Sequence, residues 1–205
     1  MRVTIRSGGL ALEGLLDDAP GRGGVVVTHP HPLYGGDMGN NVVEAIVRAY
    51  RQRGYTSLRF NFRGVGKSEG AYGEGMGEQE DVGAALAYLE ELGKTSIDLA
   101  GYSFGAWVNA LGLAGLTRAG RMVMVSPPVN SLDFSFLKYD SRIRLVIAGS
   151  ADDIAPPAMI AEMLPLWNEK ARMHIVEGAD HFYWGKTGEI ERAVMEFLES
   201  DDSSS

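Results

Sequence analysis

The sequence contains no cysteine, which excludes a thiol nucleophile and a disulfide framework. It has no run of 18 apolar residues that could span a membrane, and its first residues lack the apolar core of a signal peptide. Positive charge is scarce: 19 lysines and arginines stand against 27 aspartates and glutamates, a formal net charge of −8. An acidic surface repels a phosphate backbone. We therefore expect a cytoplasmic protein with no nucleic-acid or membrane partner.

The chain is long enough for one domain with a core of its own. It has 205 residues, of which 45% are hydrophobic and 22% charged, as is usual for a globular protein. No internal repeat or interdomain linker interrupts it. We predict a single domain over residues 1–199 and a polar, disordered tail over 200–205.

Short apolar runs alternate with segments of helical periodicity along most of the chain. Two strands are predicted within 1–18, and further strands over 25–28, 55–62, 95–100, 121–126, 142–149 and 173–176. Helices are predicted over 42–53, 78–92, 106–111, 156–167 and 187–198. This alternation favours an α/β fold, with a mostly parallel central sheet, helices on both faces and antiparallel strands at the N-terminus. Ligands of such sheets bind at the carboxyl ends of the strands, where the unusual polar residues fall: His29, His31, Arg63, Ser103, Asp152 and His181.

The pentapeptide Gly101-Tyr102-Ser103-Phe104-Gly105 reads G-x-S-x-G. It lies between a predicted strand and a predicted helix, which is the context of a nucleophile elbow. The glycines allow the strand and helix backbones to approach closely. The serine would stand at a helix N-terminus, where N–H groups stabilise an anion. Because three fixed residues also occur by chance, the interpretation depends on the partners of Ser103.

A serine nucleophile needs a general base, and the base needs an orienting acid. His181 follows the last predicted strand, whereas His174 lies inside it and is expected to be structural. Asp152 and Asp153 both follow the preceding strand. Adjacent residues of an extended segment point to opposite sides, so only one can meet the imidazole. The order serine, aspartate, histidine is that of the α/β-hydrolase fold.

Four motifs together resemble those of the α/β-hydrolases, and more closely those of small, lidless, bacterial-type serine hydrolases with a His-Pro-His-Pro-x-x-Gly-Gly loop. They are residues 29–36, 61–68, 101–105, and the pair 149–152 with 178–181. The resemblance extends from residue 25 to about 198. It implies a serine hydrolase, most often acting on esters, with Ser103 as the nucleophile, Asp152 as the acid and His181 as the base.

The same mechanism requires two N–H donors that form an oxyanion hole. One is predicted to be Phe104. The other should come from the loop after strand 25–28, where Pro30 and Pro32 have no N–H and the candidates are His31, Leu33 and Tyr34. His31 follows Pro30 in the place where the family usually has a His-Gly pair, and we favour it. The candidate pocket residues are Leu33, Tyr34, Tyr102, Ile154 and Phe182.

Two other patterns predict no further chemistry. The segment Gly64–Ser68 resembles a phosphate-binding loop. However, Asn61 occupies the position at which that motif requires its first glycine, so nucleotide binding is not expected. His29 and His31 could form half of a metal site, but no further ligands have supporting spacing. We expect no metal and no cofactor.

About 15 residues separate the strands predicted over 121–126 and 142–149. Many relatives insert a helical lid there, and this segment is too short for one. We therefore predict an open, shallow site for a small-molecule ester or thioester substrate with a small or exposed ester group.

A thioesterase, amidase or peptidase would use the same residues. The alternative of another class is a non-catalytic binding or signalling protein with this fold. The sequence makes no prediction of oligomeric state.

Overall fold

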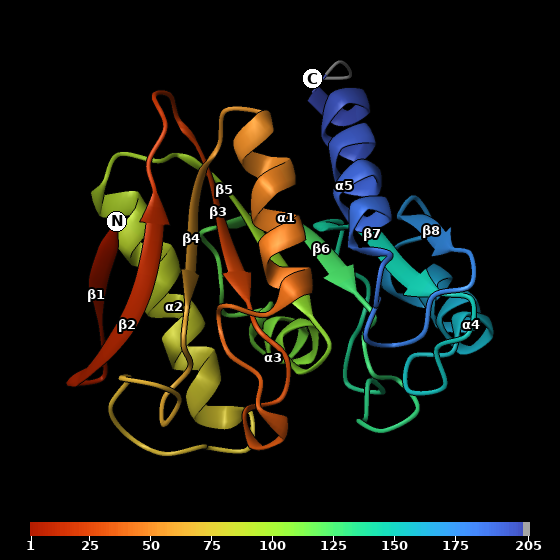
Figure 1. Ribbon diagram of the computed structural model, residues 1–205, viewed down its shortest axis with the longest axis horizontal. Coiled ribbons are helices and arrows are strands. Elements are labelled where there is room, and N and C mark those ends of the chain that lie inside the picture. Colours follow the sequence, from red (N-terminus) through yellow and green to blue (C-terminus); the bar gives the residue numbers. More distant parts are fainter. Residues whose placement is uncertain (203–205) are drawn as a thin grey trace.

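An eight-stranded sheet forms the centre of the computed structural model, which describes residues 1–202 (Figure 1). Its spatial order is β1-β2-β4-β3-β5-β6-β7-β8. The strands are β1 (Arg2–Ser7), β2 (Leu10–Asp17), β3 (Gly23–Thr28), β4 (Thr56–Phe60), β5 (Ser96–Tyr102), β6 (Ala119–Val125), β7 (Ile143–Gly149) and β8 (Arg172–Val176). β1, β2 and β4 pair in antiparallel fashion, and all pairs from β4 to β8 are parallel. The predicted fold class is confirmed.

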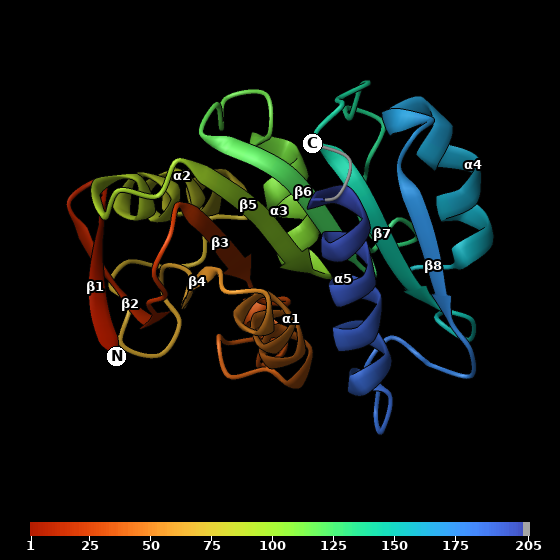
Figure 2. The same cartoon turned by 90° about the horizontal axis from the view of Figure 1, so that it is seen from above.

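Helices cover both faces of the sheet (Figure 2). α1 (Asn41–Gln52) and α5 (Thr187–Asp202) pack side by side on one face. α2 (Met76–Glu91), α3 (Phe104–Gly112) and α4 (Pro157–Asn168) lie on the other. A short 3₁₀ helix, η1 (Pro32–Tyr34), follows β3. α1 begins at Asn41, one residue before the predicted start, because the side chain of Asn40 accepts a hydrogen bond from the Val42 N–H at 2.9 Å.

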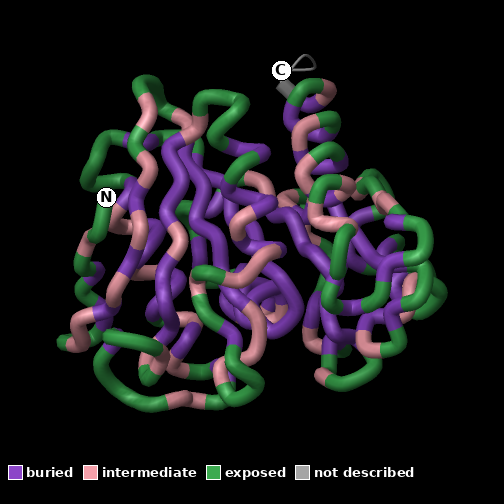
Figure 3. The backbone as a smooth tube through the Cα atoms, viewed as in Figure 1, coloured by how far each residue is buried: buried purple, intermediate pink, exposed green. Residues whose placement is uncertain are grey.

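The core has one layer on each face of the sheet. The central strands between these layers are buried over most of their length (Figure 3). The run Val25-Val26-Val27 illustrates how one strand serves both layers. Val25 and Val27 pack with the residues of α1 and α5, whereas Val26 packs on the opposite face with those of α2. Successive side chains of a strand point to opposite faces. A strand buried on both faces therefore needs a continuous β-branched run.

The C-terminal helix is longer than the sequence predicts, and ion pairs made by a buried aspartate explain the difference. Asp201 is 7% exposed. Its carboxylate accepts a hydrogen bond from Arg121 on β6 at 3.2 Å and pairs with Arg144 on β7. α5 therefore includes residues 200–202 of the predicted tail, and residues 203–205 lie outside the described part of the chain.

The connection between β6 and β7 spans 126–142, lies wholly within the described residues, and contains turns but no helix. Nothing in it resembles an inserted lid, as the sequence predicts. Within residues 1–202, none of the helices has the length and apolar character needed to cross a membrane.

Candidate active site

The turn between β5 and α3 holds Ser103 in a strained conformation. Its φ angle is +53°, which is uncommon for a residue with a side chain. A carbon atom added at Gly105 would lie 2.7 Å from the His29 carbonyl oxygen, and one added at Gly101 would lie 2.7 Å from the Ala106 nitrogen. Both glycines are therefore required by close backbone approach. Ser103 stands at the start of α3, and only 7% of it is exposed.

The structure brings Ser103, His181 and Asp152 together from the ends of β5, β8 and β7. The Ser103 Oγ lies 2.9 Å from the His181 Nε2. The His181 Nδ1 lies 3.0 and 2.9 Å from the two carboxylate oxygens of Asp152. Because a carboxylate can only accept, Nδ1 carries the proton and Nε2 is left to accept the Ser103 hydroxyl proton.

Hydrogen-bond donors hold both carboxylate oxygens of Asp152 in place. Its Oδ1 accepts the backbone N–H groups of Ile154 at 3.0 Å and Ala155 at 2.7 Å, and its Oδ2 accepts the Ser126 hydroxyl at 2.7 Å. Burial by itself would raise the pKa of this carboxyl group. The hydrogen bonds from His181, Ser126 and Ala155 outweigh burial, so the pKa lies below its ordinary value. Asp152 therefore remains an anion beside the imidazole.

Ser126 and Tyr183, two buried residues absent from the predicted site, support these side chains together with Tyr102. The Tyr183 hydroxyl lies 2.7 Å from the Ser126 Oγ, which extends the hydrogen-bonded chain beyond Asp152. The Tyr102 hydroxyl donates to the His181 carbonyl oxygen at 2.7 Å. Ser103, Ser126 and Tyr183 are three of the four non-glycine residues with positive φ among residues 1–202. For Ser126, the available signal was its position as the last residue of the strand predicted over 121–126.

Tyr102 was also a candidate pocket residue, and that prediction is wrong. The residue is 2% exposed and points under His181, because its position in β5 directs the side chain into the core. Of the other candidates, Leu33 and Tyr34 are exposed on the β3 side of the site, and Phe182 is exposed on the His181 side. Ile154 is half-buried.

The loop after β3 is closed into a tight turn beside the elbow. The His31 carbonyl oxygen accepts the N–H groups of Tyr34 at 3.1 Å and Gly36 at 3.0 Å. A side chain at Gly36 would overlap the Pro30 carbonyl group. The Leu33 N–H donates to the His31 ring at 3.2 Å. Of the candidate donors, only the His31 N–H has no acceptor among the described residues.

His29 is completely buried and holds this loop in place through two hydrogen bonds. Its Nδ1–H donates to the Pro30 carbonyl oxygen at 2.7 Å, and its Nε2 accepts the Phe62 N–H at 3.1 Å. Pro30 O and His31 N belong to one planar trans peptide, so fixing the carbonyl also fixes the direction of the N–H. His31 has different partners: its Nε2 lies 3.3 Å from the Tyr72 hydroxyl. No group of three or more metal-ligating side chains occurs among residues 1–202.

We expect His29 to make the fold acid-sensitive. Desolvation by burial lowers the pKa of His29 from 6.5 to about 4. Between these values the unfolded state binds a proton that the folded state does not. The contribution of His29 to the free energy of unfolding is therefore fully present above pH 6.5. As the pH falls towards 4, this contribution is lost, which lowers the free energy of unfolding by about 3 kcal/mol. Urea unfolding at pH 7.5, 6.5, 5.5 and 4.5 measures the loss.

The matched variant is His29→Asn, whose amide keeps a donor near the Pro30 carbonyl but does not titrate. It should be less stable than the wild type at pH 7.5 and should lose less free energy of unfolding on acidification. Equal losses in the two proteins would show that His29 is not responsible.

Two other candidates lie outside the cluster. Arg63 donates to the buried Asp81 of α2 at 2.8 Å and joins the loop after β4 to that helix. Asp153 is exposed, and its backbone carbonyl accepts a hydrogen bond from the Asn130 side chain at 3.0 Å. Of the two adjacent aspartates, only Asp152 contacts the imidazole, which agrees with the predicted preference.

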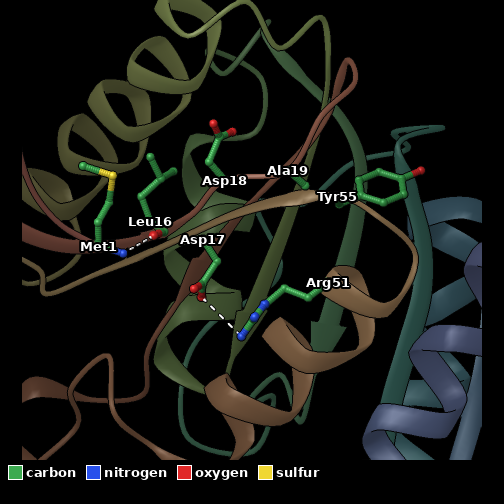
Figure 4. Close-up of a pocket in the computed structure, with 7 residues that line it drawn as sticks. All are labelled: Met1, Leu16, Asp17, Asp18, Ala19, Arg51 and Tyr55. Carbon is green, nitrogen blue, oxygen red and sulfur yellow. Dashed lines mark hydrogen bonds and ion pairs between the residues drawn. The ribbon is translucent and has the colours of Figure 1, made fainter.

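A hollow of about 350 Å³ lies at the other end of the strands, away from Ser103 (Figure 4). It is lined by Met1, Leu16, Asp17, Asp18, Ala19, Arg51 and Tyr55. Met1 precedes β1, Arg51 lies near the end of α1, and the others lie at the end of β2 or just before β3 and β4, so the hollow faces the amino ends of the parallel strands. Its lining contains neither serine nor histidine. The hollow is separate from the cluster around Ser103.

Comparison with known proteins gives the same fold and the same class of protein. An uncharacterised protein of Rickettsia prowazekii is 36% identical over 183 residues, which is 84% of this chain and 77% of that protein. An α/β serine hydrolase homologue from Coxiella burnetii is 32% identical and superposes over 97% of both chains with a TM-score of 0.89. A lidless α/β serine hydrolase from Xanthomonas campestris is 29% identical over 98% of this chain and 94% of its own, also with a TM-score of 0.89.

No protein-family model matches the chain. The assignment therefore depends on identity along nearly the whole chain and on the likeness of the structures. On both grounds, this chain belongs to the α/β-hydrolase family.

Proposed function

We propose that the protein is a serine hydrolase that cleaves small or exposed ester bonds through an acyl-enzyme formed on Ser103. The observation that supports this most directly is the hydrogen-bonded series from the Ser103 Oγ to His181 and on to Asp152, with steps of 2.9 and 2.9 Å. A protein that only binds has no need of a hydroxyl, an imidazole and a carboxylate in this geometry.

The reaction follows from the directions of these hydrogen bonds. As the Ser103 oxygen attacks the ester carbonyl carbon, its proton passes to the His181 Nε2. Asp152 keeps the Nδ1 proton in place and stabilises the imidazolium. Collapse of the tetrahedral intermediate releases the alcohol, which takes the proton from Nε2. Water then attacks the acyl-enzyme with the same proton transfers, and Ser103 is restored as the acid is released.

We assign the developing oxyanion to the N–H groups of Phe104 and His31. Phe104 is the first residue of α3, so its N–H has no partner within the helix. The packing of Gly105 against the His29 carbonyl brings the start of α3 to the loop that contains His31. Electrostatic stabilisation of this kind is worth about 10²–10³ in kcat for each donor.

The open surroundings support a substrate with an accessible ester group rather than one enclosed by the protein. The β6–β7 connection provides no helix to cover Ser103. Leu33, Tyr34 and Phe182 border the site without enclosing it. Thioesters have the same acyl chemistry and are included in the proposal. An amide requires stronger protonation of its leaving group and is the less favoured substrate.

A fluorophosphonate probe tests the proposed nucleophile. The folded protein should be labelled at one residue, and mass spectrometry of its peptides should place the adduct on Ser103. Acid-denatured protein serves as one control, since labelling depends on the assembled site. A Ser135→Ala variant, which changes an exposed serine bonded to Asp133, should be labelled like the wild type. Absence of an adduct on Ser103 in the folded protein would refute the proposal.

A further inference from the structure

Aromatic side chains form a continuous wall on one side of Ser103. The imidazole of His31 packs against three rings, with centroid distances of 4.8 Å to Tyr34, 5.3 Å to Tyr72 and 4.7 Å to Phe104. Phe104 in turn lies 5.6 Å from Trp107. We call these five residues the aromatic wall. They come from three separate segments of the chain that meet beside the nucleophile.

The wall offers ring surface to a ligand. Phe104 is buried and supports the others, whereas His31, Tyr72 and Trp107 are half-buried and Tyr34 is 88% exposed. The rings meet at interplanar angles of 39° to 57°. Aromatic rings attract one another in offset-stacked and edge-to-face arrangements, so the accessible ring surface of the wall is suited to a further planar ring.

The order of the strands places the wall opposite the base. β3 and β4 lie on one side of β5, and the segments that follow them provide His31, Tyr34 and Tyr72. β7 and β8 lie on the other side and provide Asp152 and His181. Because His181 gives its proton to the leaving group, the alcohol of an ester must leave on the β7–β8 side. The carbonyl oxygen is assigned to the N–H groups of His31 and Phe104, so we place the acyl group, the remaining substituent of the ester carbon, beside them along the wall.

The charges that act on the wall are negative. The carboxylate of Glu78 is buried, accepts the N–H groups of Gly73 and Gly75 at 2.8 Å each, and acts electrostatically on His31 and Tyr72. Glu74 also acts on Tyr72. An anionic acyl group would be repelled by these carboxylates, whereas a neutral ring would not.

From this we infer that the aromatic wall binds a neutral, planar aromatic acyl group, so that the enzyme prefers aryl-bearing carboxylic esters over saturated ones of the same size. This inference rests on the proposed function, since it names the acyl group that Ser103 receives. Tyr34 and Tyr72 would determine specificity and would take no part in the proton transfers.

The test compares methyl phenylacetate with methyl cyclohexylacetate, whose acyl groups have the same carbon skeleton but a flat aromatic ring in one and a saturated ring in the other. We expect kcat/KM of the wild type to be about 3- to 10-fold higher for the aromatic ester, from one or two ring contacts. Tyr34→Ala and Tyr72→Leu should each reduce this ratio towards one. Tyr72→Phe keeps the ring and should retain the ratio. Methyl 4-carboxyphenylacetate, which has an anionic ring, should react more slowly than methyl phenylacetate.

Tyr139→Ala is the matched control, because Tyr139 is 64% exposed and is not part of the wall. It should leave the ratio unchanged. A wild-type ratio near one, or a ratio that persists in both Tyr34→Ala and Tyr72→Leu, would overturn the inference while ester hydrolysis itself stands. Failure to hydrolyse any ester, methyl acetate included, would instead refute the proposed function. Circular dichroism of each variant establishes that it is folded.

Discussion

Ser103→Ala should lower kcat/KM for p-nitrophenyl acetate by at least about 10⁴-fold. The reason is the loss of the only oxygen that lies within hydrogen-bonding distance of the His181 Nε2 among the described residues. His181 and Asp152 would keep their own hydrogen bond, but they would have no nucleophile to activate. Release of p-nitrophenolate, followed at 405 nm and corrected for the buffer rate, measures the effect.

The fold should tolerate this change, since alanine removes one hydroxyl group and leaves the backbone of the elbow as it is. Unfolding by urea checks this, with a midpoint expected near that of the wild type or above it, because the strained site loses a polar buried atom. Ser135→Ala controls for the loss of a serine elsewhere and should retain full turnover. If Ser103→Ala kept even a tenth of the wild-type rate, another residue would have to be the nucleophile.

The sheet and most of the helices could be predicted because burial determines the pattern of apolar residues. Val25–Val27 indicates a strand buried on both faces, and Val43, Ile46 and Tyr50 indicate a helix with one buried side. All of these residues are buried in the structure. The ends of the elements are less predictable, since they depend on contacts distant in sequence. The last turns of α5 form because Asp201 reaches Arg121, 80 residues away, and no local pattern records that contact.

The main residues of the candidate site could be predicted for a related reason: in a parallel sheet, residues that follow different strands meet at one edge. That rule is sufficient for Ser103, Asp152 and His181. The rule does not predict which residues next to these three have side chains that point into the core. Tyr102 precedes Ser103, yet its side chain passes beneath His181, and Tyr183 follows His181 by two residues, yet its hydroxyl reaches Ser126.

Arg63 shows the opposite case, in which a residue at a strand end has a structural partner. Its guanidinium group makes several hydrogen bonds with the buried carboxylate of Asp81, which also accepts the Ser7 hydroxyl at 2.7 Å. Hydrogen bonds and the charge of Asp81 raise the pKa of Arg63 despite partial burial. The pair of Arg63 and Asp81 joins the loop after β4 to α2. This structural role depends on tertiary contacts alone.

The second large effect is expected for Asp152→Asn, which should lower kcat by about 10³- to 10⁴-fold although the side chain keeps its shape. The N–H groups of Ile154 and Ala155 donate to the Asp152 Oδ1, so an asparagine must place its carbonyl oxygen there. Its amide NH₂ then occupies the Oδ2 position and donates towards the His181 Nδ1. His181 is thereby held with its proton on Nε2, where it can no longer accept the proton of Ser103.

Asp153→Asn is the matched change one residue away. Asp153 is exposed, and among residues 1–202 it makes a hydrogen bond through its backbone carbonyl alone, so the substitution should alter kcat less than about twofold. The contrast separates a tautomer effect from a general loss of negative charge near the site, because both variants lose one charge. Comparable losses in the two variants would mean that charge alone sustains turnover and that Asp152 does not orient His181. A large loss for Asp153→Asn alone would assign the acid to the other aspartate.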